Sequence, residues 1–273
     1  MKTGYLLIGA LMMLCSCNNN SKQEEETATD SATLKAKREQ QLKALVNKYP
    51  DSLLLEEKLV QFYRDNENYP AAIKETDAIL KKDTMNDRWW DIKANLYSET
   101  DDTLNAVRSW EKASNINPQP TYLLPLGYLY ADMKNPKALF IARLLMNSDS
   151  TKLSKESLLI SGIYYGKTDK QKAISFFDKA LAASYTFMPA YREKASALYD
   201  LGKYSDAIIV LERALTVQST YDEAFYWLGR CYEKLGDKQS AMDNYEHAIE
   251  ISKQTINGDY VEAREALENL RGK

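Results

Sequence analysis

Few residues in this 273-residue chain could carry out acid–base or metal chemistry. His247 is its one histidine, and two of its three cysteines, Cys15 and Cys17, lie close together near the N-terminus. A zinc site or a histidine-based catalytic centre needs several such residues in one place. The sequence also contains no Gly-x-Ser-x-Gly elbow and no glycine-rich phosphate loop. We therefore expect no enzyme activity and no metal or other cofactor, and we expect His247 to lie on the surface.

The charge balance argues against nucleic acid as a partner. The chain has 36 Lys and Arg against 39 Asp and Glu, which gives a formal net charge of −3. Proteins that bind DNA or RNA through phosphates usually have a basic excess or a basic stripe. Hydrophobic residues make up 44% of the chain and charged residues 27%, so a packed core is expected and wholesale disorder is not.

The residues around Cys17 have the pattern of a processing site. After Lys2 comes an apolar run over residues 5–14, which suits a signal peptide and is too short for a membrane-spanning helix of about 20 residues. The run ends in Leu14-Cys15-Ser16-Cys17, which resembles the lipobox of bacterial lipoproteins. The resemblance implies cleavage before Cys17, residues 1–16 as the signal peptide and acyl chains, palmitate among them, on Cys17. The alternative is an ordinary secretory signal that happens to contain cysteines.

The segment after the cleavage position is polar. Residues 17–32 include Asn18-Asn19-Asn20 and Glu24-Glu25-Glu26 but no aromatic residue, so they have little apolar surface to bury. We expect a lipidated, disordered tether over 17–32. By analogy with the lipoprotein family, Asn18 after the lipid-bearing cysteine favours the outer membrane. The expected location is the cell envelope, lipid-anchored in the outer membrane, and both the periplasmic and the surface-exposed side stay open.

A fixed spacing of about 34 residues recurs through the rest of the chain. Ala173, Ala207 and Ala241 follow one another at this spacing, and a second alanine comes two helical turns after each of them. Gly202 and Gly236 fall where a turn between helices would need a left-handed residue. The pattern resembles the tetratricopeptide repeat, a helix pair with small residues where the helices cross. The resemblance implies an all-α fold, a right-handed superhelical solenoid of about six helix-turn-helix repeats.

The repeat frame gives the boundaries of one solenoid domain over residues 33–273. Six repeats are expected over residues 53–86, 87–119, 120–153, 154–187, 188–221 and 222–255. Residues 34–48 match the second helix of a partial leading repeat. Pro125, inside the first helix of the third repeat, should kink that helix or delay its start. Residues 260–271 are predicted to form a capping helix, whose buried side would hold Val261, Ala263, Ala266, Leu267 and Leu270.

In tetratricopeptide arrays the first helices line a concave surface, and their outward-facing positions bind partners. In this chain the frame places tyrosines and arginines at many of these positions, and both residue types are enriched in binding hot spots. The candidate groove residues are Arg88, Asn95, Tyr128, Tyr165, Arg192, Tyr199, Tyr226 and Arg230. For each tyrosine, packing between neighbouring helices is an equally good alternative.

These features predict a membrane-anchored scaffold or assembly adaptor. It would bind extended or helical segments of other envelope proteins, or peptides, in its concave groove. Two alternatives stay open. The tyrosines could stack on the sugar rings of a cell-surface glycan, or the groove and an exposed Trp89-Trp90 pair could mediate self-association.

Overall fold

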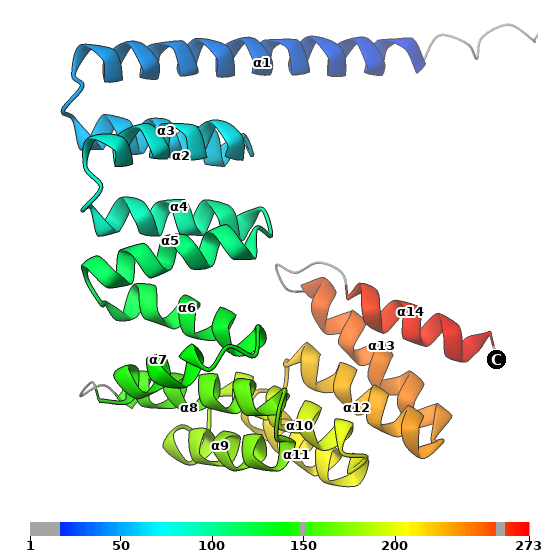
Figure 1. Ribbon diagram of the computed structural model, residues 1–273. Coiled ribbons are helices and arrows are strands. Elements are labelled where there is room, and N and C mark those ends of the chain that lie inside the picture. The colour runs from blue at the N-terminus through cyan, green and yellow to red at the C-terminus, as the bar shows by residue number, and fades with distance from the viewer. Residues whose placement is uncertain (1–16, 148–150, 255–259, 273) are drawn as a thin grey trace, which may run out of the picture. The chain divides into compact units, whose positions relative to one another are not determined.

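The structure is a computed structural model that describes residues 17–147, 151–254 and 260–272. All regular elements in these ranges are α-helices, fourteen in total (Figure 1). The prediction of an all-α helical-repeat fold is therefore confirmed. The expected signal peptide, residues 1–16, lies outside the described residues.

The chain divides into two compact units, residues 1–100 (unit 1) and residues 101–273 (unit 2). The range 33–273, expected to be one solenoid domain, includes parts of both units. Unit 1 contains α1 (Cys17–Lys48), α2 (Leu53–Asp65), α3 (Tyr69–Lys82) and α4 (Asp87–Glu99). Unit 2 contains α5 (Thr103–Ile116), α6 (Pro120–Asp132), α7 (Lys137–Met146), α8 (Thr151–Gly166), α9 (Lys170–Ala183), α10 (Met188–Asp200), α11 (Tyr204–Val217), α12 (Asp222–Leu235), α13 (Lys238–Gln254) and α14 (Val261–Arg271).

Polar residues at the helix ends explain where many helices begin and stop. Side-chain oxygens of Asn68, Asn86, Asp102 and Asp169 accept hydrogen bonds from backbone N–H groups in the first turns of α3, α4, α5 and α9. Each bond satisfies a donor that has no partner within the helix. Gly202 and Gly236 have φ of +73° and +80°, so the prediction of left-handed turn residues is confirmed at both.

The recurring small residues lie where helices pack closely. In unit 2, Ala173, Ala207 and Ala241 are fully buried. The approach is close beside aromatic rings: a Cβ built on Gly229 of α12 would lie 2.6 Å from the ring of Tyr245 on α13, and one built on Gly162 of α8 would lie still nearer the ring of Phe177 on α9. A small residue on one helix thus leaves room for a large ring on the next, and this repeated pairing holds the helix pairs together.

Two departures concern where helices begin. α1 starts at Cys17, so the segment 17–32, expected to be a disordered tether, is helical in the structure. Its Lys, Gln, Glu and Ala residues have good helix propensity, which a criterion based on apolar content overlooks. α6 starts at Pro120, so the prediction that Pro125 delays the start of this helix is wrong. Pro120 occupies the first turn, where a missing N–H removes no helical hydrogen bond.

Two further departures concern burial. Trp89 is only 3% exposed and Trp90 is partly buried, so the two do not form the exposed pair expected for self-association. Trp90 also donates from Nε1 to the carbonyl oxygen of Thr84 at 2.9 Å. In α14, Ala263, Leu267 and Leu270 are buried as expected, but Val261 is 51% exposed because it lies at the first turn, outside that buried stripe.

Candidate binding surface

In unit 2, Arg230 of α12 lies among three aromatic rings. Its guanidinium carbon is 4.5 Å from the centre of the Trp227 ring, 4.6 Å from that of Tyr199 and 5.9 Å from that of Tyr226. Trp227 and Tyr226 precede Arg230 by three and four residues, which puts all three on one face of α12. Tyr199 comes from α10, and its ring meets that of Trp227 edge to face, with centres 5.6 Å apart. These four residues are the Arg230 cluster.

The guanidinium of Arg230 is held by rings rather than by carboxylates. Within the described ranges it forms no ion pair with an acidic side chain, and its side chain is only partly buried. Ring faces attract a cation without occupying its N–H donors. The donors of Arg230 therefore stay able to form charge-assisted hydrogen bonds with a carboxylate that approaches from outside.

Arg192 of α10 is in the opposite situation. Its Nη1 lies 3.2 Å from both carboxylate oxygens of Glu223, and its Nη2 lies 3.0 Å from Glu193. The phenol of Tyr221 also donates to Glu223, at 2.6 Å. Burial alone would lower the pKa of the Arg192 guanidinium, but the charges of Glu223 and Glu193 outweigh burial and raise it. Arg192 is thus neutralised inside the protein, and we do not assign it to an external carboxylate.

Tyr226, a member of the Arg230 cluster, also contacts two aromatic rings nearer the C-terminus. Its ring centre is 5.1 Å from that of Tyr260, just before α14, and 6.0 Å from that of Tyr245 on α13. The Tyr245 hydroxyl donates to Glu233 at 3.0 Å. Burial first, and then the charge and hydrogen bond of Glu233, raise the pKa of Tyr245, so this hydroxyl stays protonated and keeps donating.

Two other predicted tyrosines of unit 2 are engaged within the protein. Tyr128 on α6 donates its hydroxyl to Glu156 on α8, and burial together with this bond raises the pKa of its phenol. Tyr165 at the end of α8 stacks on Phe176 of α9, with ring centres 5.3 Å apart and planes 11° apart. Lys172 Nζ lies 3.9 Å from the centre of the Tyr165 ring. Packing between helices, the alternative kept open for these residues, describes both.

The two predicted residues of unit 1 lie on α4. Arg88 forms an ion pair with Glu57 of α2. Asn95 donates from Nδ2 to the carbonyl oxygen of Asp91 at 2.8 Å, within the same helix. Both side chains therefore have partners inside unit 1.

The structure thus brings together three of the eight predicted groove residues, Tyr199, Tyr226 and Arg230. It adds Trp227, which the repeat frame leaves outside the groove positions. A signal for Trp227 was present in the sequence, because an aromatic residue three positions before an arginine on a helix can stack on the guanidinium. Glu223 neutralises Arg192 from α12, the first helix of the following repeat. No comparable sequence pattern predicts this contact.

Potential metal ligands are not clustered in the described ranges. No group of three or more His, Cys, Asp and Glu side chains there could hold a metal ion. His247 is exposed on α13, as expected. Cys231 is a buried free thiol, and burial raises its pKa to about 11, so it stays protonated. Over the same ranges, none of the helices combines the length and the apolar character needed to cross a membrane.

Comparison with protein families identifies the repeats. A model of the TPR repeat matches residues 195–236, and a model of the tetratricopeptide repeat matches residues 222–255. These stretches contain the whole of α11, α12 and α13 and the last six residues of α10, and so include the whole Arg230 cluster. The chain therefore carries tetratricopeptide repeats, as the regular spacing of its alanines predicts.

Curated relatives share only part of the chain. Mouse (Mus musculus) DnaJ homolog subfamily C member 7 is 23% identical over 108 residues, which is 39% of this chain and 22% of the relative. Its human (Homo sapiens) counterpart is 22% identical over 108 residues, with the same coverage. The chain thus spans about a fifth of the length of these relatives.

Solved structures match more of the chain and show its fold. A tetratricopeptide repeat protein from Parabacteroides merdae has a TM-score of 0.67 at 18% identity, over 91% of this chain and 96% of that one. PilW, described as a widely conserved type IV pilus biogenesis factor, has a TM-score of 0.61 at 18% identity, over 80% and 97%. The Cut9–Hcn1 hetero-tetramer of the APC/C has a TM-score of 0.57 at 17% identity, over 86% of this chain and 46% of the matched chain. All three likenesses support a helical-repeat solenoid.

Proposed function

We propose that this protein is a binding scaffold whose Arg230 cluster holds a segment of another protein. The observation that carries the proposal is the contrast between two arginines on neighbouring first helices. Arg192 is neutralised by Glu193 and Glu223, whereas Arg230 is held only by ring faces. A cation with unused donors beside a tryptophan and two tyrosines has the composition of a protein-binding hot spot.

The chemistry of the cluster defines the segment it would bind. A carboxylate of the partner would accept charge-assisted hydrogen bonds from Arg230. An apolar or aromatic side chain next to that carboxylate would pack on the rings of Tyr199 and Tyr226. The fold likeness to Cut9, which is solved in a complex with Hcn1, is consistent with a scaffold that assembles with other chains.

The test is an affinity capture from cross-linked cell envelopes, with the captured proteins identified by mass spectrometry. The intact chain is compared with the variant Tyr199→Ala/Arg230→Ala. The matched control is Tyr185→Ala/Arg213→Ala, which removes the same two residue types from exposed positions elsewhere in unit 2. A protein captured by the intact chain and the control but not by the cluster variant supports the proposal. Equal capture by all three contradicts it.

We also propose that the scaffold is anchored through lipid on Cys17 in the outer membrane of the cell envelope. The support is the lipobox-like sequence Leu14-Cys15-Ser16-Cys17 and the polar segment that follows it. More than one acyl chain anchors a protein durably, whereas one chain binds a membrane only marginally. A scaffold confined to a surface also meets membrane partners at a raised effective concentration.

The neighbouring cysteine supplies a control for the anchor. Cells that express the wild type, Cys17→Ser or Cys15→Ser are labelled with an alkyne analogue of palmitate and then fractionated. We expect Cys17→Ser to lose both the label and the outer-membrane fraction, and Cys15→Ser to keep both. Label retained in Cys17→Ser would contradict the assignment of the lipid to this residue.

A further inference from the structure

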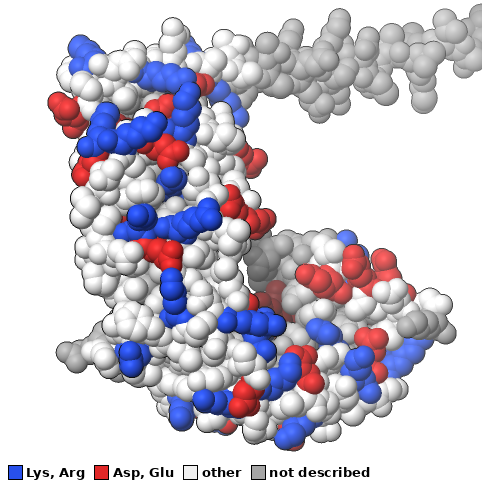
Figure 2. All heavy atoms as spheres, viewed as in Figure 1, with Lys and Arg blue, Asp and Glu red and all other residues white. Residues whose placement is uncertain are grey.

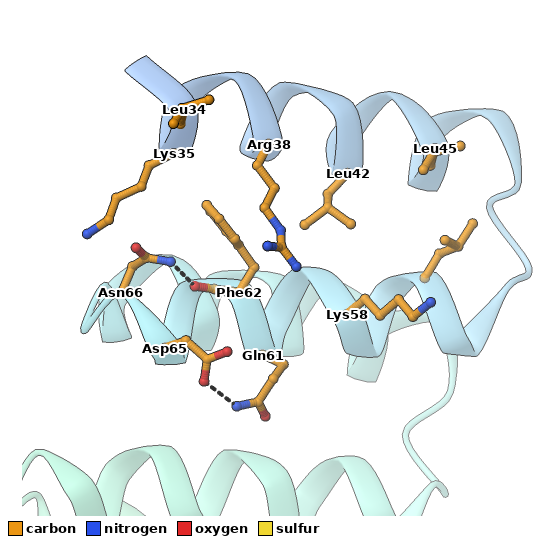
Figure 3. Close-up of a pocket in the computed structure, with 11 residues that line it drawn as sticks. Leu34, Lys35, Arg38, Leu42, Leu45, Lys58, Gln61, Phe62, Asp65 and Asn66 are labelled. Carbon is orange, nitrogen blue, oxygen red and sulfur yellow. Dashed lines mark hydrogen bonds between the residues drawn. The ribbon is translucent and has the colours of Figure 1, made fainter. Parts of the chain in front are cut away.

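An open apolar groove lies between α1 and α2 in unit 1 (Figure 3). The cavity has a volume of about 910 Å³. In Figure 3, Leu42 and Arg38 point from α1 toward α2, and Phe62 points from α2 toward α1. The ends of the groove carry Leu34 and Leu45, which are 66% and 41% exposed. This α1–α2 groove exposes leucine side chains that a folded helix pair normally covers.

Comparison with the next repeat shows which kind of element normally covers the α1 side of the groove. Arg38, Leu42 and Leu45 on α1 correspond, one repeat later, to three residues of α3. These counterparts, Ala72, Thr76 and Ile79, are 0%, 0% and 6% exposed. They are buried because α2, the first helix of their own repeat, packs on α3. The corresponding face of α1 has no first helix of its own repeat in the described part of the chain.

The α2 side of the groove leads to the same conclusion. Leu55 and Phe62 on α2 correspond, one repeat later, to Trp89 and Leu96 on α4. Both counterparts are buried, at 3% and 0% exposed, in the core that α2, α3 and α4 form. Leu55 and Phe62 are only partly buried and line the groove instead. The groove therefore has the shape and apolar lining of the position that a first helix occupies in the next repeat.

The described part of the chain does not supply a separate helix for this position. The residues that the frame assigns to it, 19–32, continue directly into α1 as one helix. Their only apolar residues are two alanines, Ala28 and Ala32, so they have no apolar face to place in the groove. The occupant that fits must come from another molecule.

The charges around the groove indicate what that occupant should carry. Its lining includes three cations, Lys35, Arg38 and Lys58. None of the three forms an ion pair with a side chain that the structure describes. The one acidic residue of the lining, Asp65, accepts a hydrogen bond from Gln61 at 2.6 Å. On the face that Figure 2 shows, this end of unit 1 carries Lys and Arg side chains with Asp and Glu side chains among them, so the charges that favour an acidic occupant are the three cations of the groove lining itself. Carboxylates on the occupant would complement them.

We propose that the α1–α2 groove is a docking site for an amphipathic, acidic α-helix of a partner protein. The helix completes the unpaired leading repeat as its first helix. By analogy with α2 it is about 13 residues long. Its apolar face packs on Leu42 and Phe62, and its acidic flanks face Arg38 and Lys58. The proposal is independent of the Arg230 cluster, which lies in unit 2.

A synthetic helix tests the groove directly. The probe copies α2, residues 53–65, because α2 occupies the equivalent position in the next repeat. A hydrocarbon staple joins positions 54 and 58, since an isolated helix of this length is marginal in water. Both side chains are exposed in the protein. Binding of the fluorescent peptide to the full chain is followed by anisotropy. A second peptide replaces Glu56, Glu57 and Asp65 by their amides.

The variants separate the groove from the rest of unit 1. We expect Leu34→Asp/Leu45→Asp to raise the Kd of the probe at least tenfold, and Arg38→Glu to raise it several-fold. Leu54→Asp is the matched control, because Leu54 is 61% exposed on α2 and does not line the groove. Circular dichroism checks that each variant is folded. The amide peptide should bind more weakly than the acidic one. Equal binding to wild type and groove variants, or no saturable binding, would overturn the proposal.

A photo-cross-link identifies the occupant in cells. p-Benzoylphenylalanine replaces Leu45 in the full chain, and the cross-linked peptide is sequenced. The proposal requires a segment of a different protein with apolar residues every three to four positions and acidic residues between them. A cross-link to a second copy of this chain, or to a segment without that pattern, would refute it. These results do not depend on Tyr199 or Arg230, so they can fail or succeed separately from the scaffold proposal.

Discussion

The guanidinium carbon of Arg230 lies 4.5 Å from the centre of the Trp227 ring, one turn away on the same helix. A cation over a ring face stabilises a protein by about 0.5–1 kcal/mol at a partly exposed site. In a double-mutant cycle with Arg230→Gln and Trp227→Leu, we expect the two changes to be coupled by that amount in the free energy of unfolding. Urea denaturation of the four proteins measures the coupling. Strictly additive effects would show that the contact does not stabilise unit 2.

The second prediction concerns the close approach at Gly229. A Cβ at this position would lie 2.6 Å from the Tyr245 ring, so Gly229→Ala forces the ring to move and should cost about 1–3 kcal/mol of stability. The preceding repeat has Ala195 and Leu211 at the matching positions. Gly229→Ala should therefore cost less in a Tyr245→Leu background than in the wild type. Thermal unfolding of the four proteins tests this, and an equal cost in both backgrounds would contradict it.

The third prediction is an alkaline loss of stability centred on Tyr130. Burial, and then its hydrogen bond to Glu111, raise the pKa of the Tyr130 phenol to about 12. The unfolded chain ionises this group near pH 10. The contribution of Tyr130 is therefore fully present below pH 10 and is lost as the pH rises from about 10 to about 12, because only the unfolded state then releases the proton.

The matched variant for this effect is Tyr130→Phe, because it removes this one hydroxyl and leaves every other titratable group in place. Between pH 9 and pH 12, the wild type should lose on the order of 1–2 kcal/mol more stability than Tyr130→Phe. Guanidinium denaturation at several pH values measures the difference. Parallel pH profiles for the two proteins would contradict the role assigned to Tyr130.

The fourth prediction concerns the thiol of Cys231. It is fully buried, and burial raises its pKa to about 11, so little thiolate exists at pH 8 and reagents cannot reach it. In a chain with Cys15→Ser and Cys17→Ser, we expect no reaction with 5,5′-dithiobis(2-nitrobenzoate) in the native state. One equivalent should react in 6 M guanidinium, a condition chosen to unfold the chain. Rapid native labelling would mean that α12 opens locally.

The sequence determined the local structure because the signals for it are themselves local. The repeat spacing places the starts of α2, α4, α10 and α12 at residues 53, 87, 188 and 222, as expected. Gly202 and Gly236 mark turns, since glycine adopts positive φ without a steric penalty. The alanine columns predict helix crossings for the same kind of reason, because only a small residue lets two helices approach closely.

Only the tertiary structure decided which polar and aromatic side chains are engaged within the protein. The repeat frame places Arg192 and Arg230 in the same class, but Glu223 neutralises the first and rings hold the second. Glu223 and Tyr199 each come from a different helix than the arginine they contact, and spacing along the chain does not fix their distances or rotamers. The open α1–α2 groove likewise cannot be predicted from the positions of apolar residues in the sequence. Burial of Leu42 and Phe62 depends on whether another helix covers them, and packing alone determines that.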